Sequence, residues 1–572
     1  MKKINRLTLV LTLMAAGLFA GCASDEEATR ENQKIALDGS HFKFTEVAYQ
    51  ADQAVTRAAA SVKPTTVDLG DDLEAEVSVT PDAPTGKTRA VDPISDGKYT
   101  ILAFDPTTHD LQGKLEGSVT GGVFTLDAGQ KLLLDPGTYD FTCFSEPVVY
   151  DEPNNRLVVN RLLTKNPMIG HVQATIAGDD YEVAFNMEHK AIRMRFNITS
   201  DILSENTPID AYLEGGVFGP YYWMHDWYTA YSGVLNNAGN ADIGTSGSLN
   251  FKTVAPVTTQ AGTTYTSDYV YMLPGLSSHE HISNHHIHFN AGTIGGASLV
   301  GKTVGVGTYP PGFQWAINQS ITINVNVKGQ LYLFEDGKAR VLAGKGTHTP
   351  IGLVIQQKWE PTNQKGTACA LEIIKKPVPP SYAWEDETKT LPSSPDHLNT
   401  TVYNGLHDGQ NDMNGYNWTW DANSTKDHMV RGDEKEKYPA FYQAGHYTPS
   451  NATITGANIG KWYIPAAGEV MKLFRLFGTA TVPANEPWRG NCNMAQTDID
   501  KMLAAFTKVN SGLLLQYQFL WTSTVCDAAN TGGFGPYTPV SFNINGNSSG
   551  QIWWPTFQKT GANFYILPFV HF

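Results

Sequence analysis

The stretch Trp462–Glu469, WYIPAAGE, decides the fold of the last third of the chain. Its first three residues predict a short strand, and Pro465 suits the first turn of a helix, where a missing backbone N–H costs nothing. Glu469 lies in that turn, where a negative charge meets the positive end of the helix dipole. One buried helical face is then predicted by apolar residues at the spacing i, i+3, i+4, i+7: Val470, Leu473, Phe474 and Phe477.

Three further elements follow toward the end of the printed sequence. WTST at Trp521–Thr524 and the alternating SFNING at Ser541–Gly546 predict strands. FYILPFVHF, at Phe564–Phe572, predicts a closing strand in a hydrophobic core. We therefore expect the chain to end inside a folded domain and not in a free tail.

The order of these motifs resembles that of the C-type-lectin-like domain found at the C-terminus of many bacterial surface proteins. That family shows a Trp-x-x-Pro-x-x-x-Glu turn, then an aromatic-Ser/Thr-Ser-Thr strand, then a closing strand that ends in Phe. The resemblance covers residues 328–572 and implies an α+β domain there. Earlier segments resemble its remaining elements: Leu331–Leu342, Pro350–Ile355, Gly366–Glu372, Tyr382–Trp384, Asp412–Thr419 and Tyr438–Tyr447.

The composition favours loop-rich β domains outside the cytoplasm. The 572 residues predict three or four domains. Charged residues make up 17% of the chain and aromatic residues 11%, and there are 53 Gly and 31 Pro. Such a composition suits secreted all-β domains better than helical ones.

The N-terminus predicts a lipoprotein. Basic residues precede the apolar run Leu7–Phe19, and Ala20-Gly21-Cys22 follows it, so residues 1–21 read as a signal peptide and Cys22 as the lipidated residue. Residues 22–40 are polar and predict a tether, and Ser24–Glu27 resembles a surface-export signal of Gram-negative lipoproteins. We expect an outer-membrane lipoprotein that is exposed on the cell surface.

The charge of the mature chain excludes nucleic acid as an expected partner. Cleavage before Cys22 removes three of the 41 Lys and Arg residues and none of the 56 Asp and Glu residues, which leaves a net charge of −18 (38 − 56). So negative a protein is repelled by phosphate backbones.

Short alternating strands with frequent turns predict β-sandwiches before the last domain. Four segments also resemble the N-terminal domain of the fimbrillins, the subunits of type V pili: Thr88–Ala90 (TRA), Asp96–Asp105, Pro136–Phe141 and Tyr181–Ile198. The resemblance implies a mainly β chain with two transthyretin-like β-sandwich domains, at residues 41–198 and 199–327. In the fourth segment we expect two strands around a turn at Glu188–Lys190.

The resemblance also implies assembly by strand exchange. In that family a protease cuts after an Arg near the N-terminus, the first strand leaves, and a neighbouring pilus subunit donates a strand to the groove. Arg89 and Arg57 both match the cleavage pattern, and the alternating Leu73–Thr80 favours Arg89. A domain closed by Phe564–Phe572 occupies the place of the donor strand, so we expect a subunit at the pilus tip.

Ligand contacts in the last domain are expected from exposed aromatic and acidic side chains. The paired motifs of a calcium-dependent sugar site are missing there, and Glu152-Pro153-Asn154 lies in the first sandwich as a turn. The loop Asp408–Gly415 lacks the glycine and glutamate of an EF-hand. No metal or cofactor is therefore expected. The candidate ligand residues are Trp418, Trp420, Trp488, Trp553, Trp554, Asp408 and Asp412.

Three other groups of residues leave two readings each. Arg431-Gly432-Asp433 is an RGD tripeptide among charged residues, hence an exposed integrin-type motif or a chance match. The histidines between His279 and His288 suggest a metal site or a polar hairpin. Cys492 and Cys526 either pair or remain buried thiols.

The sequence thus predicts a lipidated pilus tip subunit that binds a host or bacterial surface glycan or protein. The alternative is a surface glycan-binding lipoprotein outside any pilus. An oxidase of the formylglycine-generating type shares the lectin-like fold, but it needs a reactive cysteine pair, for which Cys492 and Cys526 are the candidates. No phosphate loop, GxSxG or HExxH motif occurs, so an enzyme is not expected.

Overall fold

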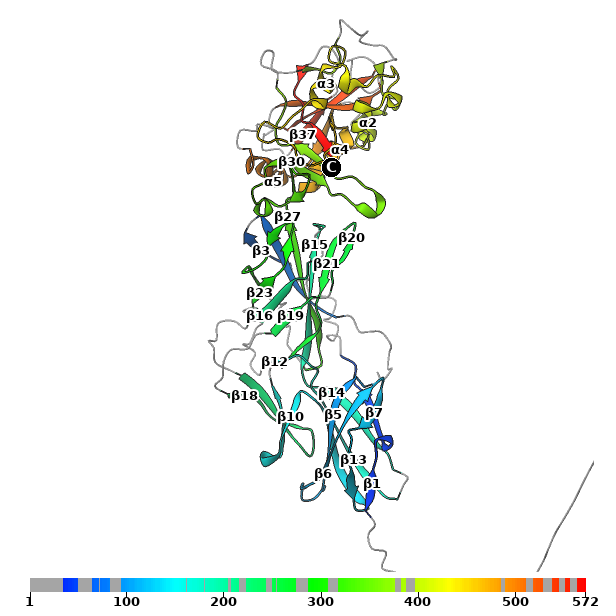
Figure 1. Ribbon diagram of the computed structural model, residues 1–572, viewed down its shortest axis with the longest axis vertical. Helices are drawn as coiled ribbons and strands as arrows, with labels where there is room; N and C mark the ends of the chain where they lie inside the picture. Colours follow the sequence, from blue (N-terminus) through cyan, green and yellow to red (C-terminus); the bar gives the residue numbers. More distant parts are fainter. Residues whose placement is uncertain are drawn as a thin grey trace, which may run out of the picture.

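The chain folds into three lobes in a row (Figure 1). The computed structural model describes residues 34–49, 64–70, 72–82, 94–160, 162–178, 181–203, 207–214, 223–242, 249–253, 255–273, 286–306, 317–375, 382–386, 397–484, 489–510, 518–527, 537–544, 551–555 and 563–572. Among these residues, the first two lobes are built of strands and every α-helix lies in the last lobe. The chain is mainly β, as its composition and period-two patterns predict.

The first lobe contains a seven-stranded sheet. Its strands pair antiparallel except at one edge, where β2 runs parallel to β14. A short pair, β1 (Ile35–Leu37) and β8 (Leu132–Leu134), lies beside it. The sheet order is β2 (Phe42–Glu46), β14 (Val183–His189), β13 (Met168–Ile176), β9 (Gly137–Ser145), β5 (Gly97–Phe104), β6 (Leu111–Thr120) and β7 (Val123–Leu126).

The middle of this sheet, in β5 and β9, is buried on both faces. Ile101 and Ala103 of β5 enter one hydrophobic cluster, while Leu102 and Phe104 enter another on the opposite face. This is why β5 reads as a continuous apolar run and not as an alternation. The second face packs on a four-stranded sheet: β10 (Val148–Asp151), β11 (Arg156–Asn160), β17 (Trp223–Thr229) and β18 (Leu235–Asp242).

The second lobe is a sandwich of two sheets. The larger one has the order β12 (Leu162–Leu163), β22 (Val270–Met272), β15 (Ile192–Ser200), β27 (Ser320–Gly329), β4 (Leu73–Pro81) and β3 (Thr65–Gly70), and β21 (Gly262–Thr266) with β20 (Val257–Thr259) continues beside β15. The facing sheet is β19 (Leu249–Lys252), β16 (Asp210–Glu214), β23 (His286–Ala291) and β26 (Thr303–Gly305), and the pair β24 (Thr293–Ile294) and β25 (Ala297–Ser298) lies nearby.

Strand pairing crosses the boundary expected at residues 198 and 199. The β3–β4 hairpin precedes that boundary and β15 (Ile192–Ser200) spans it, yet all three strands lie in the sheet of β27. The opposite case is β17, which follows the boundary but pairs with β11 of the first lobe. The cause is non-local backbone pairing, which local hydrophobic patterns do not reveal.

The expected turn at Glu188–Lys190 is a passage between lobes. Strand β14 continues through His189 in the first lobe, and β15 begins at Ile192 in the second. Met187 therefore packs in the core of the first lobe, whereas Ile192 packs in that of the second. Two alternating runs look like a hairpin in sequence whether they pair with each other or not.

The last lobe, which follows β27, is an α+β domain. One sheet has the order β29 (Ala339–Arg340), β28 (Tyr332–Phe334), β30 (Pro350–Gln356), β31 (Thr367–Ala370), β39 (Phe569–His571) and β33 (Trp462–Tyr463). The other is β34 (Arg489–Asn493), β37 (Gln551–Pro555), β36 (Thr538–Ile544) and β35 (Phe519–Cys526), and β32 (Tyr382–Ala383) pairs with β38 (Asn563–Phe564). The helices are α1 (Gly405–Gly409), α2 (Gly415–Trp420), α3 (Pro439–Gly445), α4 (Ala467–Phe477) and α5 (Gln496–Thr507).

Short 3-10 helices complete the described elements. They are η1 (Gly39–His41), η2 (Glu152–Asn154), η4 (Leu342–Gly344), η5 (Glu360–Thr362), η7 (Ala422–Ser424) and η8 (Arg431–Asp433). The first sandwich thus carries Glu152-Pro153-Asn154 as a turn, as expected.

The closing segment is an internal strand of its sheet. β39 pairs with β31 on one side and with β33, from the WYIPAAGE stretch, on the other. Helix α4 follows that stretch and buries Val470, Leu473 and Phe474 fully. The helical face and the closing strand agree with the sequence expectations. Pro465 does not lie in the first turn as expected: the helix begins at Ala467 with Ala466 as its N-cap, so Pro465 precedes the helix.

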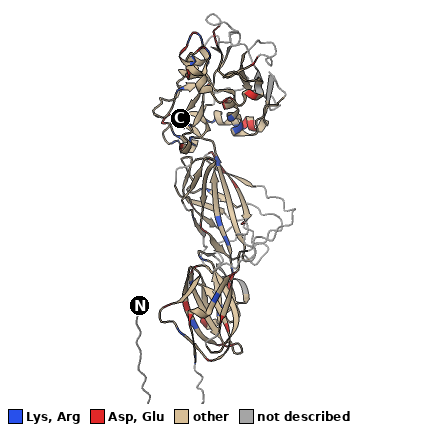
Figure 2. Cartoon of the chain, turned by 90° about the vertical axis from the view of Figure 1, so that its right-hand side faces the viewer, with Lys and Arg blue, Asp and Glu red and all other residues tan. Residues whose placement is uncertain are grey.

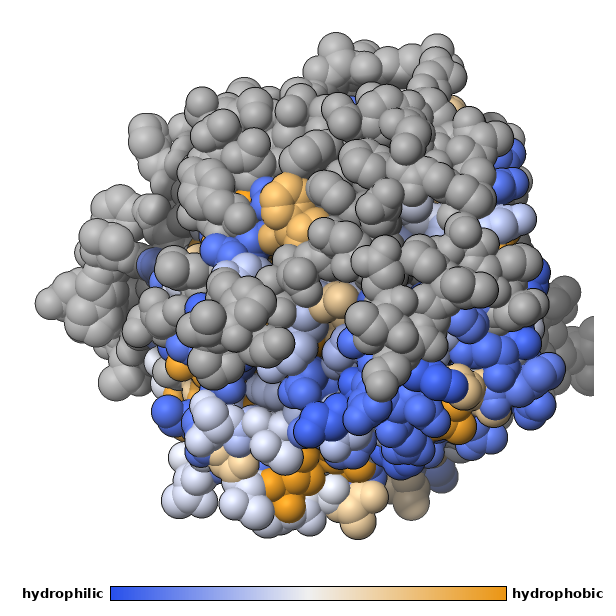
Figure 3. Space-filling view, turned by 90° about the horizontal axis from the view of Figure 1, so that it is seen from above, coloured by the Kyte–Doolittle hydropathy of each residue, from blue (hydrophilic) through white to orange (hydrophobic). Residues whose placement is uncertain are grey.

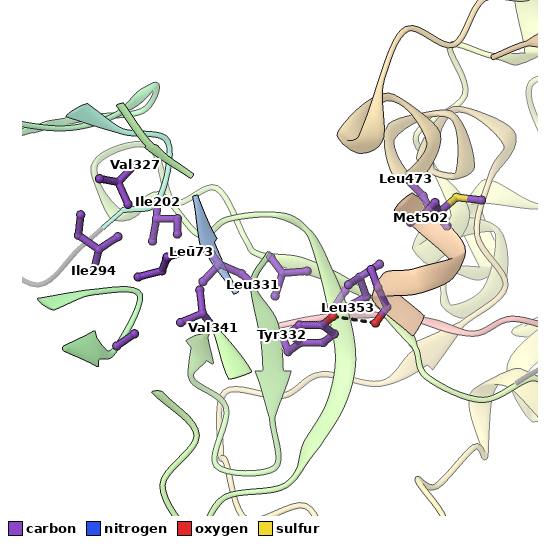
Figure 4. Packing of buried hydrophobic residues seen from close by; sticks show 14 of the residues in the cluster. Leu73, Ile202, Ile294, Val327, Leu331, Tyr332, Val341, Leu353, Leu473 and Met502 are labelled. Atoms are coloured by element: carbon purple, nitrogen blue, oxygen red, sulfur yellow. Dashed lines mark hydrogen bonds between the residues drawn. The ribbon is translucent and has the colours of Figure 1, made fainter. Parts of the chain in front are cut away.

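One hydrophobic cluster joins the second sandwich to the last domain (Figure 4). It runs from Leu73 and Val327 of the sandwich through Val341 to Leu473 and Met502 of the last domain. Polar contacts cross the same junction. Lys508 Nζ lies 2.6 Å from Asp72 Oδ1, and the Gln357 amide donates to the carbonyl of Asp201 at 2.7 Å. The N-terminal strand β4 is therefore part of this junction.

Charged residues of both signs are scattered over the three lobes in the view of Figure 2. Within the described residues, no helix is long and apolar enough to cross a membrane.

Candidate functional site

The edge of the second sandwich is formed by the segment that precedes Arg89. β4 pairs antiparallel with β27 over nine residue pairs, from Leu73 with Gly329 to Pro81 with Ile321. β3 lies outside β4 and ends the sheet. We call the side of β27 that β4 covers the acceptor edge.

Alternate residues of β4 fill the core of the sandwich. Leu73, Ala75 and Val77 are buried, and Val79 is half-buried against the same cluster. Facing residues of β27 point into that core as well, and all are buried: Ile321, Ile323, Val325 and Val327. Each buried aliphatic side chain contributes about 1.5–3 kcal/mol, so the acceptor edge holds its strand by core packing as well as by backbone pairing.

The outer face of the same strands is a polar ladder. The Asn324 amide donates to Thr80 Oγ1 at 2.9 Å, and the Lys328 ammonium lies 2.9 Å from the Glu76 carboxylate. On the far side of β27, the Asn197 amide donates to Asn324 Oδ1 at 3.2 Å. The ladder fixes the register of β4, because a slip by one residue would bring apolar side chains to this face.

The first lobe also holds a strand from the N-terminal segment at its edge. β2 pairs with β14 over five residues, and Phe42 is buried. Beyond β2, the Tyr49 ring stacks on His189 with centroids 3.7 Å apart, and the Arg193 guanidinium lies 4.0 Å from the Tyr49 ring centroid. The segment therefore contacts both sandwiches.

The predicted lipidation and cleavage residues lie outside the described residues. These are Cys22, Arg57 and Arg89. The described strands nevertheless bracket the two arginines: β2 ends at Glu46, β3 and β4 span Thr65–Pro81, and β5 begins at Gly97.

Two of the predicted ligand residues are buried in the last domain. Trp418 and Asp412 are 2% and 0% exposed, and the indole Nε1 donates to the Asp412 carboxylate at 3.0 Å. The Thr524 hydroxyl donates to the same carboxylate at 2.7 Å. Burial raises the pKa of Asp412 despite these hydrogen bonds. The pair ties α2 to β35 and has no free surface for a ligand.

Trp420 and Asp408 are both accessible to solvent, to different degrees. Trp420 is half-buried, its Nε1 donates to the carbonyl of Trp462 at 2.8 Å, and the Lys461 ammonium lies 4.0 Å from its ring centroid. A Cβ on Gly445 would come within 2.7 Å of that ring, so the glycine permits the close packing. Asp408, on α1, is exposed.

Three tryptophan candidates remain. Trp488 lies outside the described residues, and Trp553 and Trp554 are in β37 with side chains that are not described. Seen from the end of the last domain, the described surface is mostly hydrophilic (Figure 3).

The RGD tripeptide is not an exposed motif. Arg431 is 0% exposed in η8, and its Nη1 donates to Asn399 Oδ1 at 2.6 Å. Its guanidinium lies 5.0 Å from the ring centroids of both Trp384 and Tyr438. The expectation that the tripeptide is exposed is therefore wrong, because three aromatic side chains enclose the arginine: Trp384, Tyr438 and Phe441.

Histidines and acidic residues do not gather into a metal site in the described part of the chain. His286 and His288 lie on the same, outer face of β23, and the remaining histidines of that group are outside the described residues.

The four described cysteines are buried, unpaired thiols. Burial raises the pKa of Cys492 to about 12.

This burial predicts the reactivity of the thiols in a chain that begins after Cys22. We expect no thiol to react with a disulfide reagent in the native protein and four to react after unfolding. Rapid reaction of Cys492 or Cys526 in the native protein would contradict this burial.

The carboxyl group of Glu469 caps helix α4. Its Oε2 accepts from the Ala466 N–H at 2.7 Å, and the Tyr463 hydroxyl lies 2.8 Å from Oε1. Burial, with a smaller contribution from the neighbouring Asp412, raises the pKa of Glu469 to about 8. At neutral pH the group is mostly protonated, so it acts as a neutral hydrogen-bonding cap and not as the charge expected to meet the helix dipole.

Sequence reasoning missed the polar contacts that surround the end of β4. Asp82 accepts hydrogen bonds from Ser320 and Thr322. The polar positions of the ITINVNV segment, at Thr322, Asn324 and Asn326, were a signal for such an outer face. Their partners lie more than 200 residues away in sequence and could not be read from it.

No family model and no curated protein matches the chain. Among solved structures, it is similar to a protein from Bacteroides fragilis described as a cell adhesion protein, with 14% identity, a TM-score of 0.30, and coverage of 50% of this chain and 93% of that one. A fimbrial protein from Bacteroides ovatus shows 12% identity and a TM-score of 0.26 over 94% of this chain and 99% of the other. A second protein described as a cell adhesion protein, from Bacteroides uniformis, shows 15% identity and a TM-score of 0.27 over 42% of this chain and 95% of the other. These TM-scores are too low to assign a function.

Proposed function

We propose that this chain is a lipidated cell-surface pilus tip subunit and adhesin. It accepts a strand from a neighbouring subunit after a protease removes its own N-terminal segment. The observation that carries the proposal is the position of β4, which fills the acceptor edge from a segment that precedes Arg89. Once that segment leaves, β27 presents an unpaired strand edge and a vacant apolar groove, which is what an added strand requires.

The two candidate cleavage residues have different consequences. A cut after Arg57 frees β1 and β2 alone, and β4 stays on β27. A cut after Arg89 frees β3 and β4 as well and opens the acceptor edge. This difference supports Arg89 as the cleavage residue.

The internal position of β39 supports the tip location. A donor strand must be free to leave its own subunit, whereas β39 is paired on both sides, with β31 and β33. In our proposal the last domain is C-type-lectin-like and binds a host or bacterial surface glycan or protein. The remaining ligand candidates are Asp408, Trp420, Trp488, Trp553 and Trp554. Cys22 anchors the subunit in the outer membrane before assembly.

The test is treatment of the full chain with an arginine-specific protease in the presence of excess labelled peptide that copies residues 73–82. We expect cleavage after Arg89, loss of the native N-terminal segment and stable uptake of the peptide, measured by mass spectrometry and size-exclusion chromatography. Arg89→Ala should abolish uptake, whereas Arg57→Ala should leave it unchanged. Uptake by the uncleaved chain, or none after cleavage, would contradict the proposal and favour a glycan-binding lipoprotein outside a pilus.

A further inference from the structure

The end of β4 is held by a set of hydroxyl groups that converge on one carboxylate. Asp82 follows the strand, and its carboxylate accepts hydrogen bonds from Thr322 Oγ1 at 2.5 Å, Ser320 Oγ at 2.6 Å and Tyr269 Oη at 2.8 Å. The Arg195 guanidinium lies 3.9 Å from the same carboxylate. We call Ser320, Thr322, Tyr269 and Arg195 the carboxylate cradle.

The cradle is built to hold a negative charge. The Asp82 side chain is 13% exposed, and burial opposes its ionisation. The three hydroxyl donors and Arg195 outweigh burial and hold the pKa of Asp82 below its ordinary value. Hydrogen bonds to an ionised acceptor are roughly twice as strong as neutral ones, so the contact selects a carboxylate over an amide.

A second arginine supports the cradle from behind. Arg193 Nε donates to Ser320 Oγ at 2.6 Å, which orients that hydroxyl toward Asp82. The guanidinium groups of Arg193 and Arg195 lie 4.5 and 4.9 Å from the Tyr269 ring centroid. These contacts join the two arginines to Ser320 and Tyr269 and do not involve Asp82.

The cradle and its occupant come from opposite sides of Arg89. Asp82 precedes the arginine, while β15, β27 and Tyr269 all follow it. Removal of the N-terminal segment takes the anion away and leaves three hydroxyl donors and two guanidinium groups without it. The emptied cradle keeps its hydroxyl donors and positive charge, and hydrogen bonds to a charged acceptor are the stronger ones, so it favours an incoming acid.

The surface beside the cradle has room for a side chain. A hollow of about 350 Å³ is lined by polar residues of the same outer face. It lies along the strand that β4 occupies, since Thr80 and Asp82 line one of its sides. An acid one methylene longer than aspartate therefore has space to reach the same donors.

We propose that the carboxylate cradle binds an acidic residue at the end of the donor strand. This contact adds to the packing of the strand's apolar residues in the groove. The inference rests on the proposed strand acceptance and names the partner's chemistry. In the register of β4, the partner strand carries apolar residues at the positions of Leu73, Ala75, Val77 and Val79, and an Asp or Glu at the position of Asp82.

The test compares three peptides on the full chain after cleavage and release of its N-terminal segment. Each copies residues 73–82 with an acetylated N-terminus and an amidated C-terminus, so that no terminal carboxylate competes. One has the native sequence, one carries Asp82→Asn, and the matched control carries Glu74→Gln, since Glu74 is exposed on the same strand. We expect Asp82→Asn to weaken binding at least about tenfold at pH 7, and Glu74→Gln to change it less than about twofold.

Variants of the cradle complete the experiment. Arg195→Gln and Tyr269→Phe should each reduce the discrimination between the native and Asp82→Asn peptides. In the chain itself, Asp82→Asn should speed release of the cleaved N-terminal segment, and Glu74→Gln should not. Equal binding of the native and Asp82→Asn peptides would overturn this inference but not the proposed strand acceptance. Binding of none of them would overturn the proposed strand acceptance, and the inference with it.

Discussion

Phe569→Ala should lower the free energy of unfolding of the last domain by about 3–5 kcal/mol, the usual cost of truncating a buried Phe. The side chain is 0% exposed, and β39 pairs with strands on both sides. Its ring lies 6.4 Å from that of Tyr463 in an edge-to-face arrangement, so the change also removes contacts with the WYIPAAGE stretch. Hydrogen exchange of β31 and β33, followed by mass spectrometry on the full chain, measures the effect.

The control for Phe569→Ala is Leu476→Ala, on α4 of the same domain. That side chain is 43% exposed, so we expect a change below about 0.5 kcal/mol. β5 of the first lobe serves as an internal reference, because no part of its clusters comes from the last domain. If Phe569→Ala left exchange in β31 unchanged, the strand would be dispensable to its own domain. It would then be suited to donation, and the tip location would be contradicted.

Local patterns predicted the elements whose partners are near in sequence or whose periodicity is strong. Helix α4 is one case, since its buried face repeats at helical spacing directly after Pro465. The closing strand is another, because its run of apolar residues requires a core whatever its neighbours are. In both, the residues that define the element also define its burial.

Patterns failed where burial depends on distant residues. The residue types of Trp418 and Asp412 suggest ligand contacts at the surface. In the fold, Thr524, more than 100 residues away in sequence, donates a hydrogen bond to the buried Asp412 carboxylate. Arg431 looks exposed among charges, yet the rings of Trp384 and Phe441 enclose it. The pairing of β4 with β27 joins segments about 250 residues apart, so the acceptor edge could be predicted only as an alternating strand, without its partner.

Glu469→Gln should remove a pH dependence from the stability of the last domain. The pKa of Glu469 is raised from 4.5 to about 8 in the folded protein. Between these two values the folded state keeps the proton that the unfolded state loses. The stabilisation is therefore complete below about pH 4.5 and falls as the pH rises to about 8, by roughly 3–5 kcal/mol in all.

Gln resembles the protonated acid in shape and in hydrogen bonding. Its carbonyl can accept from the Ala466 N–H, and its amide can donate to the Tyr463 hydroxyl, the two groups that now contact Glu469. We expect the two proteins to be equally stable near pH 5 and the variant to be more stable at pH 9. Urea unfolding at each pH measures the difference.

The comparison is made as variant minus native protein at each pH, because other buried groups titrate in the same range. His571 has its pKa lowered to about 4 by burial, and Asp412 has its pKa raised, but both contributions are shared by the two proteins. The matched control is Glu360→Gln, whose carboxylate is 73% exposed and should change stability little at any pH. A variant that is less stable than the native protein at pH 9 would show that Glu469 is ionised in the fold. The charge–dipole role expected from the sequence would then hold, because a buried carboxylate that stays ionised must be stabilised by the N-terminus of α4.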